Sequence, residues 1–207
     1  MTSLSEVLSD REYEALRSVA ESGVSNSATG LSQMIGREID MRALEVSVLP
    51  INQVPGLLAG PEETLVGIYL AILGDIAGHI LLLFSLTEAT RLVDMLMDQP
   101  AGTTTSLGAM ERSALGEVGN LTGSFFLNAL AEATKLGGQP SPPAVIVDMG
   151  FAILDVPLVA LAVTSDDVLV IKTAFLEDER HIQALFLVMP DVESLRAILG
   201  SLGKSSG

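Results

Sequence analysis

The sequence predicts an α/β fold of two pseudo-symmetric halves, in which a pair of long helices packs on a mixed β-sheet. Segments with helical periodicity alternate with apolar runs of strand length, and the order long helix, strands, short helix occurs twice. Of the 207 residues, 48% are hydrophobic, which is enough for a sizeable core. We expect a single domain over residues 1–207, with half-repeats at approximately 9–98 and 107–203.

A long helix opens the first half. Ser9 and Glu12 have the spacing of a capping box, and apolar residues follow at helical intervals, which predicts a helix over about residues 10–35 that ends near Gly36. An alternating run and two apolar runs joined by a turn then predict a strand and a hairpin. The strands are expected at residues 44–49, 64–73 and 76–85, and a short helix at residues 87–97.

The second half repeats this order after a small polar connector at residues 99–106. Residues 150–165 are left open, because their Ala and Leu content favours a helix while Pro157 and the valines favour a strand. The other elements expected are a long helix at 107–136 ended by Gly137-Gly138, a strand at 144–148, a hairpin at 167–176 and 181–189, and a closing helix at 191–202.

An offset of 99 residues aligns the two long helices. Identity between the halves is thin, but the order of elements agrees, so we infer a duplicated unit whose long helices pack as a pair over a shared sheet. The offset pairs Leu16 with Leu115, Val19 with Val118, Ser25 with Ser124 and Leu31 with Leu130.

Composition excludes several classes of function. The chain has no cysteine, which excludes disulfide scaffolds, thiolate metal sites and thiol nucleophiles. Its two histidines, His79 and His181, are far apart, which argues against a histidine-rich metal site or a Ser/His/Asp triad. The net charge of −15 argues against nucleic acid and anionic membranes as partners and fits a partner with a basic surface.

The sequence also favours a cytoplasmic protein over a membrane protein. The N-terminus lacks the basic region and apolar stretch of a signal peptide. Residues 64–86 are long and apolar, but Gly74-Asp75 and His79 interrupt them, so we expect a buried hairpin instead of a membrane span.

Glu117 and Asn120 form the candidate chemical site. Three residues apart, they lie side by side on one face of the predicted helix. A carboxamide both donates and accepts hydrogen bonds, so Asn120 can orient a water molecule without adding negative charge. Asn is a weak helix former, so its position in mid-helix calls for another reason.

Nearby residues have two interpretations each. Ser113 is either an ordinary helix-start serine or a hydrogen-bonding group at the site, and Pro143 either enters the next strand or borders the site. Gly116, Gly119 and Gly123 each cost about 1 kcal/mol relative to Ala inside a helix, so they permit close approach of either a partner or the neighbouring helix.

The pattern Ser113-x3-Glu117-x2-Asn120-x22-Pro143, with the segment Leu121 to Leu130 after it, resembles the signature of the CheC/CheX/FliY family. The resemblance covers nearly the whole chain and implies a chemotaxis phosphatase that hydrolyses the aspartyl phosphate of the response regulator CheY. It implies catalytic roles for Glu117 and Asn120, with Ser113, Gly123 and Pro143 as lower-ranked binding residues. In that family the glutamate pairs with a lysine of the regulator, and the asparagine enters beside the phosphorylated aspartate.

The first half departs from this signature. Residues 26–35 resemble the family segment that follows the motif, and an alignment without gaps puts Glu14, Ser18, Glu21 and Leu44 at the four motif positions. A gapped alternative keeps Glu21 as the glutamate and puts Val24 where the asparagine belongs. Either alignment loses the amide, so we expect one working site per chain.

The resemblance also implies that the Mg²⁺ ion comes with the regulator and that this chain holds no metal or cofactor of its own. A rival interpretation is a non-catalytic binding module for chemotaxis proteins such as CheD. A flagellar-switch component like FliY ranks last, because that protein carries an additional C-terminal domain.

Overall fold

The computed structural model describes residues 9–50, 53–57, 63–161, 167–177 and 179–202, and within them helices pack on both faces of an antiparallel sheet. The predicted elements occur in the predicted order, and η2 and β4 are present in addition. They are α2 (Asp10–Ile35), β1 (Asp40–Pro50), η2 (Pro55–Leu57), β2 (Thr64–Gly74), β3 (Gly78–Ser85), α3 (Leu86–Leu96), α4 (Ala109–Thr134), β4 (Gly138–Pro140), β5 (Ala144–Met149), α5 (Gly150–Leu161), β6 (Asp167–Glu177), β7 (Arg180–Pro190) and α6 (Val192–Leu202).

The two halves exchange strands within the sheet. Its strand order is β1-β6-β7-β3-β2-β4, and β5 also pairs with β2. Thus β1 of the first half pairs with the second hairpin, while β4 and β5 pair with the first hairpin. Every described pairing is antiparallel, so the expectation of a mixed sheet is corrected. The pattern of apolar residues in a strand indicates which side chains are buried. It does not indicate which strand will be its neighbour or in which direction that neighbour runs, because pairing depends on how distant segments pack.

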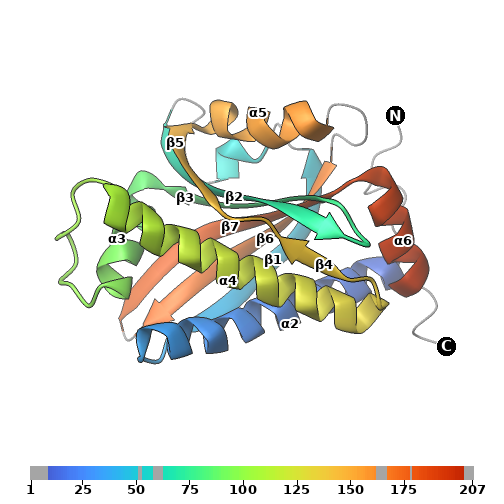
Figure 1. Cartoon of the computed structure of the whole chain (residues 1–207), viewed down its shortest axis with the longest axis horizontal. Coiled ribbons are helices and arrows are strands. Elements are labelled where there is room, and N and C mark those ends of the chain that lie inside the picture. Colours follow the sequence, from blue (N-terminus) through green and yellow to red (C-terminus); the bar gives the residue numbers. More distant parts are fainter. Residues whose placement is uncertain (1–8, 51–52, 58–62, 162–166, 178, 203–207) are drawn as a thin grey trace.

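The predicted α/β fold with paired long helices is confirmed, as Figure 1 shows. α2 and α4 lie side by side in antiparallel directions on one face of the sheet, with α3 and α6 at opposite ends of the pair. α5 covers the other face. The larger hydrophobic core lies under the helix pair, and a smaller one lies under α5.

The 99-residue offset appears directly in the helix ends. α2 and α4 each contain 26 residues, and their first residues, Asp10 and Ala109, are 99 positions apart. Both helices end in a left-handed residue, Gly36 with φ 71° and Lys135 with φ 64°. The positive φ at Lys135 is uncommon for a residue with a side chain. The second long helix therefore ends in the same backbone conformation as the first, although lysine replaces glycine at the cap.

Two equivalent side-chain contacts establish the same register between helix and strand. The hydroxyl of Tyr13 donates to the backbone oxygen of Val46, and the guanidinium of Arg112 donates to that of Val145 at 3.2 Å. Each pair of counterparts is 99 residues apart. The ungapped alignment of the halves is therefore the structural one.

The segment left open by the sequence is helical up to Leu161. α5 continues through the position of Pro157, although proline removes one backbone hydrogen bond. Ile153 and Leu154 are buried in the smaller core, and this packing stabilises the helix. Residues 162–165 lie outside the described residues.

Residues 64–86 form the β2–β3 hairpin as predicted, with the first residue of α3 at their end. Within the described residues, no helix is both long and apolar enough to cross a bilayer.

Candidate functional site

Helix α4 presents Glu117 and Asn120 at its surface. Glu117 is exposed and Asn120 is half-buried, while Val118 and Gly119 between them face the core. Among the residues that the structure describes, none forms a hydrogen bond or an ion pair with either side chain. Both polar groups are therefore available to a second molecule.

The glycines of α4 face the sheet and the residue that precedes β5, Pro143. A Cβ atom on Gly119 would collide with Ile68 of β2, and one on Gly123 would contact Leu70 and Ile80. From the sequence we expect Gly116, Gly119 and Gly123 to permit close approach of a partner or of the neighbouring helix. Both expectations are wrong, because these glycines face the sheet and Pro143. Gly123 is buried, so it lets the helix approach the sheet and offers no surface to a ligand.

Close approach of the two long helices depends instead on glycines of α2. A Cβ atom on Gly23 would lie 2.8 Å from the Cα atom of Phe126, and Gly30 faces the ring of Phe125. α2 therefore packs closely along one side of α4, and the side of α4 that carries Glu117 stays exposed.

Pro143 packs against the turn of α4 that carries the site. A Cβ atom on Gly116 would lie 3.4 Å from the Cγ atom of Pro143. The proline therefore lies against the helix next to Glu117, just before β5 begins at Ala144. The 22-residue spacing of the motif thus corresponds to a contact in space.

Ser113 lies on the same side of α4 as Glu117. It is exposed in the second turn, because the helix begins at Ala109 with Gly108 as its N-cap. Ser113 is therefore not the N-cap of α4, and its role at the site stays a prediction.

Ser113 and Glu117 line a surface groove of about 370 Å³. The C-terminal ends of α2 and α3 form its other walls. We call it the methionine groove; its lining residues are Met34, Ile35, Leu96, Met97, Met110, Ser113, Ala114 and Glu117.

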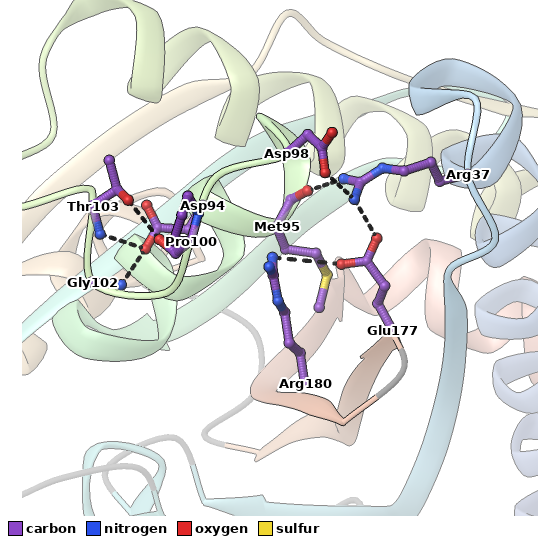
Figure 2. Close-up of polar contacts among 9 residues, drawn as sticks. All are labelled: Arg37, Asp94, Met95, Asp98, Pro100, Gly102, Thr103, Glu177 and Arg180. Carbon is purple, nitrogen blue, oxygen red and sulfur yellow. Dashed lines mark hydrogen bonds and ion pairs between the residues drawn. The ribbon is translucent and has the colours of Figure 1, made fainter.

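Two polar clusters brace the α3 wall of the groove (Figure 2). In the first, the guanidinium of Arg37 donates to the backbone oxygen of Met95 and pairs with Asp98 and Glu177, at 2.8 Å to each carboxylate. These contacts tie the end of α2 to the end of α3 and to β6. No local pattern predicts these contacts, because the partners are far apart along the chain.

Asp94 forms the second cluster. Its buried carboxylate accepts backbone hydrogen bonds from Gly102, Thr103 and Thr104 at 2.7, 3.2 and 2.7 Å. Burial by itself raises the pKa of Asp94, but the hydrogen bonds from the connector outweigh it and hold the pKa below its ordinary value. The connector that leads into α4 is thereby anchored to α3.

The corresponding face of the first half has different chemistry. Glu21, the counterpart of Asn120, pairs with Arg17 at 2.9 Å, and Ser18 replaces Glu117. Leu44, the counterpart of Pro143, is 58% exposed. The amide, the free carboxylate and the proline are thus all replaced.

The family model described as CheC-like matches residues 110–147, a segment that contains all four motif residues. A Bacillus subtilis protein named CheY-P phosphatase CheC is 27% identical over 202 residues, which cover 96% of this chain and 97% of that protein. The chain is therefore similar to CheC proteins over nearly its whole length. A Halobacterium salinarum protein named putative CheY-P phosphatase CheC1 is 23% identical and matches 96% of this chain and 100% of its own length.

Solved structures share this fold. FliY from Thermotoga maritima superposes with a TM-score of 0.76 at 18% identity, covering 96% of this chain and 99% of that one. The middle domain of FliM from H. pylori superposes with a TM-score of 0.62 at 12% identity, covering 94% and 99%. The family resemblance drawn from the motif is confirmed, and the structural likenesses extend it to the fold of nearly the whole chain.

Proposed function

We propose that this CheC-like chain hydrolyses the aspartyl phosphate of a CheY-like response regulator, and that Glu117 and Asn120 carry the activity. One observation carries the proposal: the two side chains lie one helical turn apart at the surface of α4, with no bonding partner among the described residues. Two full-length relatives named as CheY-P phosphatases support the substrate class.

The proposed reaction needs little from this chain. An aspartyl phosphate is an acyl phosphate, and hydrolysis requires water in line with the leaving carboxylate. Water attacks phosphorus, the bond between phosphorus and the aspartate oxygen breaks, and inorganic phosphate and a free carboxylate result. In the proposal, Asn120 holds the attacking water and Glu117 binds a lysine of the regulator. The Mg²⁺ ion that offsets phosphoryl charge is supplied by the regulator.

The chemistry of Asn120 also accounts for a single active face. A carboxylate at that position would stand beside the phosphoryl oxygens, where two like charges about 4 Å apart repel by several kcal/mol at intermediate dielectric. Glu21 has this disadvantage, and it is already paired with Arg17. We therefore assign the activity to the second half, and we expect a cytoplasmic protein because the proposed substrate is cytoplasmic.

Phosphate release from a CheY-like regulator phosphorylated with acetyl phosphate tests the proposal. Wild-type protein should accelerate release, and Asn120→Ala should lower the acceleration by about 100-fold because water is no longer oriented. Asn128→Ala is the matched control, since Asn128 is an exposed asparagine of the same helix, and it should behave as wild type. Equal decay with and without the protein would refute the proposal.

The binding-module interpretation makes the opposite prediction. Glu117→Ala and Asn120→Ala variants that fully complement a deletion strain would favour it, with CheD as a candidate partner.

A further inference from the structure

The methionine groove has an unusual surface for a folded protein. Met110 is 71% exposed and Met34 is 41% exposed, and both border the groove next to Glu117. Large apolar side chains that gather around a concavity mark interaction sites more often than scattered ones do. Methionine suits such a surface, because its flexible and polarisable side chain adapts to different partners.

We propose that the methionine groove is the docking surface for an apolar side chain of the response regulator, next to the basic group that binds Glu117. The inference rests on the proposed function and deepens it, because it adds a specificity surface outside the reacting atoms. Charge complementarity identifies the occupant. Glu117 is the one charged residue among those that line the groove, and no described residue supplies it with a cation. The occupant must therefore combine an apolar group with a positive charge.

A second copy of this chain fits the groove poorly. Each chain carries a net charge of −15, so two copies repel one another at any interface without compensating cations. A regulator with a basic residue at its active site would instead be attracted to the carboxylate of Glu117.

The first half provides an internal comparison. At the 99-residue offset, Arg11 corresponds to Met110 and Ala133 corresponds to Met34. The two long helices have the same length, and their cap positions correspond at the 99-residue offset, so packing alone would call for similar residues at both places. Of these two equivalent places, only the one beside the free carboxylate carries the exposed methionines Met34 and Met110, which links this pair to the site and not to folding.

The groove is also formed before any partner arrives. Arg37 joins the ends of α2 and α3, and Asp94 anchors the connector that leads to Met110 (Figure 2). A wall held by such contacts needs little ordering on binding, which lowers the entropic cost of association.

Affinity for a CheY-like regulator carrying beryllium fluoride, as a stable mimic of the phosphoryl group, tests the inference. The double variant Met34→Ser/Met110→Ser should weaken binding by about tenfold or more, since it removes two apolar contacts. In phosphate release it should raise KM and leave kcat unchanged. Met149→Ser is the matched control, because Met149 is 53% exposed on β5 outside the groove.

The two proposals fail in distinguishable ways. Asn120→Ala should bind the loaded regulator like wild type while losing turnover. If turnover depends on Asn120 but the methionine double variant binds like wild type, the docking inference is overturned. If the double variant and Met149→Ser weaken binding equally, the effect is not specific to the groove and the inference also fails.

Methyl NMR of labelled methionine provides an independent readout. Addition of the loaded regulator should shift the signals of Met34 and Met110 and leave that of Met149 unchanged. Self-association of the wild type that the double variant abolishes, measured by sedimentation without regulator, would assign the groove to a second copy and overturn the inference.

Discussion

Pro143 lies against Gly116, with its Cγ atom 3.4 Å from the position that a Cβ atom on Gly116 would occupy. Gly116 directly precedes Glu117, and Pro143 directly precedes β5. This contact therefore joins the start of β5 to the turn of α4 that carries the candidate carboxylate. In the first half the counterparts are Arg17 and Leu44, and Arg17 instead pairs with Glu21. The glycine and the proline therefore form a matched pair that belongs to the second face.

Alanine at Gly116 should be tolerated, whereas alanine at Gly119 should destabilise the protein. At Gly116 the new methyl group meets Pro143 at an acceptable distance, and the better helix propensity adds up to about 1 kcal/mol of stability. At Gly119 the methyl group collides with Ile68, and overpacking costs about 1–3 kcal/mol. Urea unfolding of the two variants measures the difference, and equal stabilities would contradict the packing described.

Removal of the Arg17–Glu21 pair should leave the proposed activity intact. The double variant Arg17→Ala/Glu21→Ala changes only the first face, so phosphate release should continue at the wild-type rate. Its stability should change by less than about 1 kcal/mol, because both side chains are half exposed. A loss of about half the activity would instead indicate two working faces, in contrast to the near-complete loss expected for Asn120→Ala.

Asp94→Asn should destabilise the protein by about 2 kcal/mol at pH 7, because an amide directs N–H groups at backbone donors that the carboxylate accepts. The folded-state pKa of Asp94 is lowered, so its contribution is complete above the unfolded pKa of about 3.9. The contribution is lost as the pH falls through the folded pKa. The stability gap between wild type and variant should therefore narrow below about pH 4.

Denaturant melts between pH 7 and pH 3 measure that gap. Asp98→Asn is the control, since Asp98 pairs with Arg37 at the surface and its loss should cost less than about 1 kcal/mol. A gap that stays constant down to pH 3 would show that the charge of Asp94 is not what holds the connector.

Local signals predicted most elements well. The capping box of Ser9 and Glu12 and the terminal Gly36 gave the bounds of α2, because these residues satisfy backbone groups within a single turn. The short strand β4 was not predicted, since its three residues include Gly138 and Pro140 and carry no strand pattern. Pro157 left α5 undecided, because the packing that stabilises this helix comes from the sheet.

The candidate site divides in the same way. Spacing along the chain was sufficient to put Glu117 and Asn120 on one face of a helix, because helical periodicity is a local property. It was not sufficient to show which side of α4 is open, since apolar residues and glycines occur around much of that helix. Only its packing on α2 and β2 shows that Gly119 and Gly123 are buried and that Glu117 is exposed.

The bounds of α2, the 99-residue repeat and the E-x-x-N pair thus follow from the sequence, because each depends on neighbours within a few residues or on the direct comparison of two segments. The end of α4 does not, since the helix stops at Thr134 with Lys135 as its cap and not at Gly137-Gly138. Strand exchange between the halves, the methionine groove and the clusters around Arg37 and Asp94 required the tertiary structure. Each of these joins segments far apart in the chain, and their meeting depends on how all the elements pack together. Sequence periodicity does not encode that arrangement.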